Sequence, residues 1–212
     1  MRIYAVADIH GKSRRLDRIR KNIESYTPDL LVAAGDMTKY FNPDPAIAEL
    51  NRLPVPVLAL RGNSDRKRVE HLINGSTNIG SLHLQRHEKD GICLAGIGGT
   101  IPIPFRTRVA FKEKPLVRRL SEIAQNADVL VAHPPPYGFV DLVAGRAHAG
   151  WKRLTVLMAE LEPALIICGH IHESAGFAWT GRTMVVNCAM GSGRGGAVID
   201  LEKGDTPEVR MI

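Results

Sequence analysis

A short apolar segment, residues 164–168, ends at Gly169 and is followed by His170 and His172. A run of this length between a proline and a glycine is typical of a strand buried on both faces. In α/β sheets, such strands present functional groups at their carboxyl ends. In an extended backbone the side chains of residues i and i+2 point the same way, so the two imidazoles can converge on one point or on two neighbouring points. The segment therefore predicts a buried strand that delivers two imidazoles to one edge of a sheet.

Four further strand-like runs end in the same manner, at a side chain of a type that binds metal ions. Together, the five runs are followed by Asp8, His10, Asp36, Asn63, His133, His170 and His172. Each side chain alone has an ordinary explanation, such as a helix cap, a turn residue or a hydrogen-bonded histidine. Their joint occurrence at strand ends instead predicts a metal centre. Imidazole and carboxylate ligands suit Mn²⁺, Fe, Co²⁺, Ni²⁺ and Zn²⁺.

The order of the apolar runs predicts the architecture. Through the first two thirds of the chain, strand-like runs alternate with amphipathic segments that predict helices, among them residues 14–25, 115–124 and 151–161. Asp44 is the predicted N-cap of another helix. Strands are also expected at residues 82–85 and 92–97, whereas residues 137–150 are expected to be irregular. The last quarter contains only strand-like runs. This shift favours a layered α/β sandwich with a partly antiparallel second sheet, in a single domain that covers residues 1–212.

The composition is that of an ordinary soluble protein. Of the 212 residues, 44% are hydrophobic and 24% are charged. No apolar segment is long enough to cross a bilayer, so no membrane partner is expected. Asp8 interrupts the first apolar run too early for a secretory signal. Cys93, Cys168 and Cys188 are widely spaced in apolar surroundings, which favours reduced thiols in the cytoplasm.

The formal net charge of +6 favours anionic partners. Basic residues are nevertheless scattered, and small clusters such as Arg14-Arg15 and Arg118-Arg119 are typical of solvated helix faces. The sequence lacks a basic stripe interleaved with aromatic residues, the pattern that suits single-stranded nucleic acid. Nucleic acid therefore stays open as a partner but is not favoured.

The strand-end residues form motifs in a characteristic order. The motifs are Asp8-x-His10, Gly35-Asp36, Gly62-Asn63-x-Asp65, His133 and Gly169-His170-x-His172. The series resembles the calcineurin-like metallophosphoesterase superfamily over essentially the whole chain. The compact length and the late stretch Val186-Asn187…Gly191…Gly193 are most similar to its small prokaryotic phosphodiesterase branch. The resemblance implies a four-layer α-β-β-α sandwich of two mixed sheets flanked by helices.

The resemblance also implies a cofactor, namely two divalent metal ions with Mn²⁺ favoured. One ion would be held by Asp8, His10, Asp36 and His172. The other would be held by Asp36, Asn63, His133 and His170, so that Asp36 bridges the two ions.

A centre of this composition carries excess positive charge, because two divalent ions outweigh two carboxylates. The excess suits an anionic phosphate ester. Paired metal ions can lower the pKa of a bridging water and hold both the attacking oxygen and the phosphate oxygens for in-line displacement. The expected reaction is therefore hydrolysis of a small phosphate ester by a metal-bridging hydroxide, with Asp36 and Asn63 in catalytic positions. Asn63 is also expected to contact the substrate.

One position departs from the family pattern. Many members carry a histidine after the Gly-Asn pair, where it assists the leaving oxygen, but this chain has Ser64. A hydroxyl is a poor general acid near neutral pH. The departure favours phosphodiesters, because small phosphodiesterases of the superfamily often lack that histidine. The following residue, Asp65, is expected to cap the helix that starts near Arg66.

The loop after His133 offers a replacement for the missing histidine. His148 lies there between glycines and is the predicted catalytic residue that contacts the substrate and protonates the leaving group. Arg146 is predicted to bind the substrate phosphate, and Arg106 and Arg108 are further candidates for clamping it.

Several alternatives stay open. The first is a phosphomonoesterase that acts on nucleotides or phosphoproteins, and the second is a nuclease. The third is a non-catalytic protein-binding module, because the superfamily includes a retromer scaffold subunit with this fold. All ligand positions are filled in this chain, which favours an enzyme. Association into a homo-oligomer is also left open.

Overall fold

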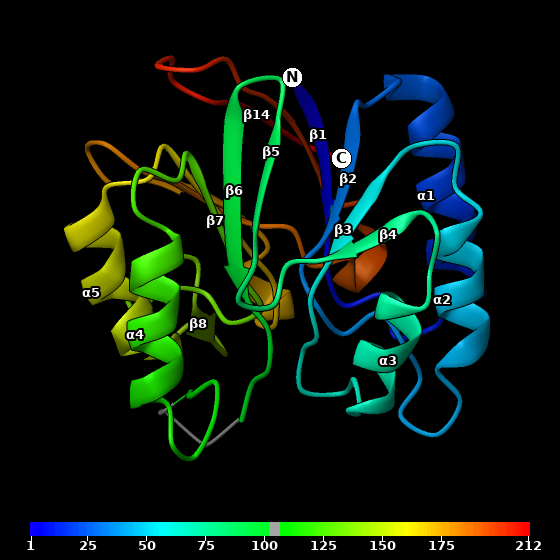
Figure 1. Cartoon of the computed structure of the whole chain (residues 1–212), viewed down its shortest axis with the longest axis horizontal. Helices are drawn as coiled ribbons and strands as arrows, with labels where there is room; N and C mark the ends of the chain where they lie inside the picture. The colour runs from blue at the N-terminus through cyan, green and yellow to red at the C-terminus, as the bar shows by residue number, and fades with distance from the viewer. Residues whose placement is uncertain (102–106) are drawn as a thin grey trace.

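Two sheets packed face to face form the centre of the molecule. The computed structural model describes residues 1–101 and 107–212. Three helices cover the outer face of one sheet and two cover the outer face of the other (Figure 1). The four-layer α-β-β-α sandwich is therefore confirmed. The helices are α1 (Ser13–Tyr26), α2 (Asp44–Asn51), α3 (Arg68–Asn74), α4 (Lys114–Ile123) and α5 (Lys152–Leu161).

The first sheet has six strands in the order β14-β13-β1-β2-β3-β4. Its strands are β1 (Arg2–Val6), β2 (Leu30–Ala33), β3 (Val57–Ala59), β4 (Ile79–Ser81), β13 (Ala197–Asp200) and β14 (Glu208–Met211). Strands β1 to β4 run parallel, whereas β13 and β14 are antiparallel to their neighbours. The carboxyl ends of β1, β2 and β3 therefore lie at the same edge of this sheet.

The second sheet has six strands in the order β11-β12-β10-β7-β6-β5. Its strands are β5 (Arg86–Lys89), β6 (Ile92–Ile97), β7 (Val129–Ala132), β10 (Leu165–Cys168), β11 (Gly176–Trp179) and β12 (Met184–Asn187). The four central strands are parallel, and each edge strand is antiparallel to its neighbour. Both sheets are therefore mixed.

Alternation along the strands explains the layers. In β1, Ile3 and Ala5 face the second sheet, whereas Tyr4 and Val6 face the helices α1 to α3. All four side chains are fully buried. A strand with apolar side chains on both faces can lie only between two covering layers, as the apolar runs in the sequence indicated.

The N-terminal cap predicted for the second helix is wrong. Asp44 is the first residue of α2 rather than its cap, and Pro43 occupies the capping position without a side-chain hydrogen bond. The carboxylate of Asp44 instead accepts a hydrogen bond of 2.7 Å from Nη2 of Arg68. The tertiary contact with Arg68 takes the place of the local cap.

Other differences concern short or exposed strands. Residues 82–85, predicted as a strand, lie between β4 and β5, and within them only His83 forms an isolated bridge, to Gly96. β5 is a polar edge strand, so it lacks the apolar pattern that predicts strands. The segment 137–150, expected to be irregular, contains a small hairpin of β8 (Leu142–Val143) and β9 (Ala147–His148).

Two further expectations concern the thiols and the membrane. Cys93, Cys168 and Cys188 are all buried and form no disulfide. Burial raises the pKa of the Cys168 thiol well above its ordinary value. Across residues 1–101 and 107–212, no helix is both long and apolar enough to span a bilayer.

Candidate metal centre

The seven predicted ligand side chains lie close together at the carboxyl ends of the parallel strands, where the edges of the two sheets adjoin. Three of the loops that carry them follow strands of the first sheet, and two follow β7 and β10 of the second. The side chains are Asp8, His10, Asp36, Asn63, His133, His170 and His172.

The first group of close ligand atoms comes from Asp8, His10 and His172, and these atoms lie within 4.8 Å of one another. Nε2 of His172 lies 3.0 Å from Oδ1 of Asp8, and Nε2 of His10 lies 3.8 Å from the same oxygen. The two imidazole rings meet edge to face, with centroids 5.5 Å apart. Two imidazole nitrogens thus converge on one carboxylate oxygen.

The second group comes from Asp8, Asp36 and His133, which are all buried. Nε2 of His133 lies 3.6 Å from Oδ2 of Asp36 and 3.9 Å from Oδ1 of Asp8. Oδ1 of Asn63 lies 3.2 Å from the same nitrogen. Oδ2 of Asp36 also lies 4.0 Å from Nε2 of His10, so this oxygen stands between the two groups.

The orientation of His133 is set by its other ring nitrogen. Nδ1 lies 2.8 Å from the carbonyl oxygen of Ala34 and donates to it, which directs Nε2 toward the carboxylates. Burial alone would lower the pKa of His133, but the charges of Asp36 and Asp8 outweigh it and raise the pKa to about 9. Oxygens of Asp8, Asp36 and Asn63 surround Nε2 of His133. A positive charge between the nitrogen and these oxygens, carried by a proton or a metal ion, would stabilise this arrangement.

Asp8 provides a second indication that a cation belongs here. Its Oδ2 accepts the backbone N–H of His170 at 2.9 Å. Its buried Oδ1 has no partner in hydrogen-bond geometry among residues 1–101 and 107–212, although Nε2 of His172 is close. Burial would raise the pKa of Asp8, but the nearby His172 and His133 outweigh burial, and the pKa is lowered. A buried, ionised oxygen without a hydrogen bond fits the coordination of a metal ion.

The prediction of an extended backbone through His170 and His172 is wrong. His170 has a φ of 71°, in the left-handed region, and His172 begins a short 3₁₀ helix, η1 (His172–Ser174). The chain turns directly after β10 instead of continuing in an extended form. Both imidazoles still reach the site, and the ring of His170 lies 5.1 Å from that of His133. Burial, together with the charge of His133, lowers the pKa of His170 to about 4, which keeps its imidazole neutral.

Two of the motif glycines allow this close approach. Gly35 has a φ of +99°, and a side chain there would also overlap Nδ1 of His133. At Gly169 a Cβ would overlap the Cβ of Ala7 and lie 2.7 Å from Oδ2 of Asp8. The glycine in each motif thus makes room for a ligand that comes from a different part of the chain.

Asp65 joins two of the ligand loops, and its predicted role as a helix cap is wrong. Its Oδ1 accepts the backbone N–H and the hydroxyl of Thr38, at 2.9 and 2.7 Å. Its Oδ2 accepts the N–H groups of Met37 and Gly62, each at 3.1 Å. These backbone donors belong to the loops that carry Asp36 and Asn63, so the buried carboxylate holds the two loops together.

A family model described as calcineurin-like phosphoesterase matches residues 1–174. The chain belongs to this family. The resemblance seen in the sequence motifs is therefore confirmed.

Relatives of this calcineurin-like phosphoesterase extend over nearly the whole chain. Uncharacterized protein MJ1162 of Methanocaldococcus jannaschii is 32% identical over 199 residues, which cover 88% of this chain and 87% of the relative. The crystal structure of TT1561 of Thermus thermophilus has a TM-score of 0.70 at 16% identity and covers 99% of this chain and 98% of its own. A structure described as a novel archaeal phosphodiesterase has a TM-score of 0.57 at 16% identity, with 100% and 99% covered. The two solved structures share the fold of this chain.

Ser64 stands where many family members carry a histidine, and in this chain it donates hydrogen bonds to the predicted ligand Asp36. The backbone N–H of Ser64 donates to Oδ1 of Asp36 at 2.7 Å, and its hydroxyl donates to Oδ2 at 2.8 Å. Burial would raise the pKa of Asp36, but the nearby charge of His133 and the hydrogen bonds from Ser64 hold the pKa well below its ordinary range. Ser64 thus supports an ionised Asp36.

His148 lies on β9, next to a residue that the sequence did not single out. Its Nδ1 is 2.6 Å from Oδ1 of Asp141, and its ring lies 5.4 Å from that of Tyr137. Asp141 is buried, and its Oδ2 accepts the N–H groups of Gly138 and Gly150 at 3.0 and 2.9 Å. Asp141 therefore holds both the hairpin and the imidazole. The one sequence feature that could have indicated this role is the position of Asp141 within the otherwise apolar residues 139–143.

Two of the three predicted arginines, Arg108 and Arg146, lie outside the cluster of ligand side chains. Arg146 is exposed in the turn between β8 and β9. Arg108 lines two cavities together with Glu113 and Arg153, on the side of α4 and α5. Arg106 falls outside the described residues.

Proposed function

We propose that this protein is a phosphodiesterase that uses two divalent metal ions, with Mn²⁺ favoured and Fe, Co²⁺, Ni²⁺ or Zn²⁺ as alternatives. The observation that carries the proposal is the pair of adjacent ligand groups, which share Asp8 and have Oδ2 of Asp36 within 4.0 Å of a histidine nitrogen from each group. One ion would be held by Asp8, His10, Asp36 and His172, and the other by Asp36, Asn63, His133 and His170.

The donor set fits such ions. Its nitrogens and carboxylate oxygens suit borderline divalent cations, and the unpartnered Oδ1 of Asp8 is a ready acceptor for one. When bound, a pair of these ions neutralises phosphate charge and lowers the pKa of a water to be used as the nucleophile. The protein's own share is to hold the ligands. The Ala34 carbonyl orients His133, and the hydroxyl and N–H of Ser64 orient Asp36.

Protonation of the leaving oxygen is assigned to His148. Asp141 orients its imidazole, and this pairing of a buried carboxylate with a half-exposed histidine is typical of general acids and bases. The hairpin that carries His148 is fastened beside the ligand His172. Ser174 Oγ of η1 donates to the Leu142 carbonyl at 2.7 Å, and a carboxylate oxygen of Glu173 accepts the Ala144 N–H at 3.0 Å.

The preference for diesters is supported by Ser64. Its hydroxyl is occupied by Asp36, so it is not free to donate a proton to a leaving group at that position. The description of an archaeal phosphodiesterase with the same fold agrees with this preference. Asn63 and Arg146 are proposed to contact the substrate phosphate, and a cytoplasmic location is proposed from the three free thiols.

Turnover of two nitrophenyl esters tests the proposal. Protein purified without chelator should contain about two divalent ions per chain. With Mn²⁺ added, it should hydrolyse bis-p-nitrophenyl phosphate at least tenfold faster than p-nitrophenyl phosphate. Asp36→Asn should abolish turnover and lower the metal content. A faster monoester reaction would assign a phosphomonoesterase, and a folded protein without turnover of either ester would favour a protein-binding module.

A further inference from the structure

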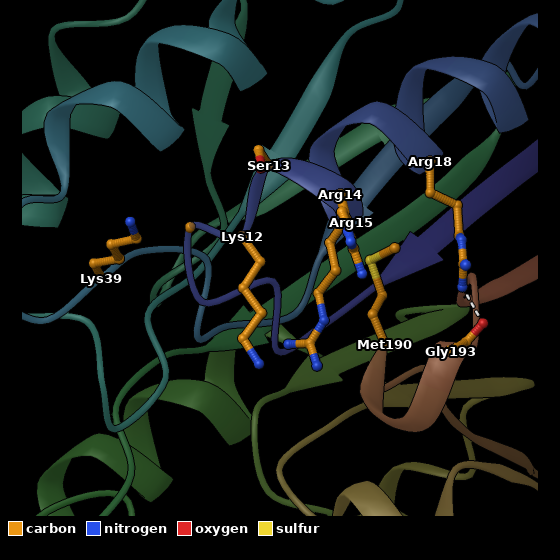
Figure 2. A pocket seen from close by; sticks show the side chains of 9 residues that line it. Lys12, Ser13, Arg14, Arg15, Arg18, Lys39, Met190 and Gly193 are labelled. Atoms are coloured by element: carbon orange, nitrogen blue, oxygen red, sulfur yellow. Dashed lines mark hydrogen bonds between the residues drawn. The ribbon is translucent and has the colours of Figure 1, made fainter.

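A basic cavity of about 600 Å³ lies at the start of α1, and no part of the proposed function uses it. Figure 2 shows Lys12, Arg14 and Arg15 at the beginning of the helix, Arg18 further along it, and Lys39 on the opposite side of the cavity. We call this cavity the basic pocket. Its lining consists of Gly11, Lys12, Ser13, Arg14, Arg15, Arg18, Lys39, Met190 and Gly193.

The basic pocket begins next to the first ligand group. Gly11 directly follows the ligand His10, and a Cβ on Gly11 would lie 3.0 Å from the side chain of Lys39. Nη1 of Arg15 donates a hydrogen bond to the carbonyl oxygen of Asp8. On the other side, Met190 precedes Gly191, whose position is packed against the side chain of His172. The lining of the pocket therefore adjoins the loops that carry His10 and His172, and one of its arginines contacts the backbone of Asp8.

The charge of the pocket is not neutralised by the protein. Lys12, Arg14, Arg15, Arg18 and Lys39 line it, and no carboxylate does so among the described residues. Within the part of the chain that the structure describes, none of these five side chains forms an ion pair, and Arg18 donates to the neutral carbonyl of Gly193.

Arg20 lies on the same helix and, unlike the arginines of the basic pocket, is paired with carboxylates. It forms ion pairs with Asp17 and Glu49. Neither of these carboxylates is among the residues that line the basic pocket. The start of α1 adds to the positive potential, because the helix has no capping side chain on its first N–H groups.

We propose that the basic pocket binds a second phosphate group of the substrate, so that the preferred substrate is a nucleotide diester that carries an additional phosphate. This proposal rests on the proposed phosphodiesterase function and names its substrate class. Unpaired guanidinium and ammonium groups are the usual partners of phosphate oxygens. A cavity of this size suits a nucleotide-sized group.

The test compares two esters that differ only in the second phosphate. They are thymidine 5′-(p-nitrophenyl phosphate) with and without a 3′-phosphate, and the readout is released nitrophenolate. For the wild type, the 3′-phosphate should lower KM at least tenfold with little change in kcat. In the double variant Arg14→Gln, Lys39→Gln, this advantage should fall below twofold. Arg20→Gln, a matched change on the same helix but outside the pocket, should retain it.

A binding measurement separates this proposal from the proposed function. Calorimetry on the metal-free protein should show that thymidine 3′,5′-bisphosphate binds at least tenfold more tightly than thymidine 5′-monophosphate, and that the double variant loses the difference. Equal KM values for the two esters would overturn the proposed role of the pocket. The same would follow if Arg20→Gln lost the advantage of the 3′-phosphate as fully as the double variant. Neither result would contradict the proposed phosphodiesterase function. Tight binding of the bisphosphate without hydrolysis of either ester would support the pocket and overturn the phosphodiesterase.

Discussion

Ser64 donates to both carboxylate oxygens of Asp36, with its backbone N–H 2.7 Å from Oδ1 and its hydroxyl 2.8 Å from Oδ2. The serine thus orients a proposed ligand in place of a histidine that would act on the leaving group. Hydrogen bonds to metal ligands commonly change metal affinity by about 10- to 100-fold. Ser64 is therefore expected to act on ion binding rather than on proton transfer.

The variant Ser64→Ala tests this role. It keeps the backbone hydrogen bond but removes the hydroxyl, so its affinity for Mn²⁺ should fall about 10- to 100-fold. Calorimetric titration of metal-free protein measures the affinity. Ser76→Ala, which removes a hydroxyl that donates to the Leu72 carbonyl, should bind Mn²⁺ like the wild type. Wild-type affinity in Ser64→Ala would contradict the assignment.

The variant His148→Gln tests the leaving-group assignment. General acid catalysis contributes about 10²- to 10⁴-fold, so turnover of an ethyl ester of thymidine 5′-phosphate should fall by that factor. The nitrophenyl ester, whose leaving group needs no proton, should lose less than about threefold on the same reasoning. Steady-state rates on both esters give the ratio. Equal losses on the two esters would show that His148 does not protonate the leaving group.

Asp141 is expected to act through His148 as a positioning residue. In Asp141→Asn, turnover of the ethyl ester should again fall more than turnover of the nitrophenyl ester. Adding this change to His148→Gln should cause little further change in the ratio of the two turnover rates. His87→Gln is the control, because that ring contacts the Ser81 carbonyl away from the site. A uniform loss on both esters in Asp141→Asn would assign Asp141 to hairpin structure alone.

The buried carboxylate of Asp65 should matter for stability. An asparagine offers only one acceptor oxygen, so two of the donors now bonded to Asp65 would face an amide group. Asp65→Asn should lower the free energy of unfolding by about 1–3 kcal/mol, measured by urea denaturation. Asp17→Asn, which breaks an exposed pair with Arg20, should cost less than about 1 kcal/mol. Equal effects of the two variants would contradict this role.

Metal binding should release a proton from His133. The pKa of about 9 means that the metal-free protein carries this proton at neutral pH. An ion that takes Nε2 must displace it, so about one proton should be released from His133 near pH 7.5, and this number should fall as the pH rises through about 9. Binding enthalpies of Mn²⁺ in buffers with different ionisation enthalpies count the protons. Constant proton release up to pH 9.5 would contradict the prediction.

The ends of the buried strands, and the side chains that follow them, could be predicted from the sequence by two general rules. Apolar runs such as residues 164–168 mark buried strands, and parallel strands bring their carboxyl ends to one edge. The rule places Asp8 and Asp36 at one edge of the first sheet, and His133 and His170 at one edge of the second, but it does not show that the two edges meet. It does not specify the turns that follow, so the left-handed backbone at His170 was missed.

The roles of Asp65 and Asp141 could not be predicted, because their partners are backbone N–H groups brought near by the fold. Sequence alone offers each acid a local use, such as capping the next helix, and carries no sign of the distant donors. The pattern of Arg14-Arg15 indicates a solvated helix face, and Arg14 is indeed exposed, but the sequence does not show that the pair lines a cavity with Lys39. Its relation to Lys39 exists only once the loops after β1 and β2 lie side by side.

The two ligand groups draw on both sheets, since Asp8 and Asp36 follow strands of the first sheet whereas His133 and His172 follow strands of the second. An ion held by both sets cross-links the two halves of the molecule at one end of their shared interior. Cation binding and cohesion of the sandwich should therefore be thermodynamically linked, and saturating Mn²⁺ is expected to raise the thermal unfolding temperature of the chain. In metal-free protein, we expect this end of the interface between the sheets to open more readily than in the metal-bound protein.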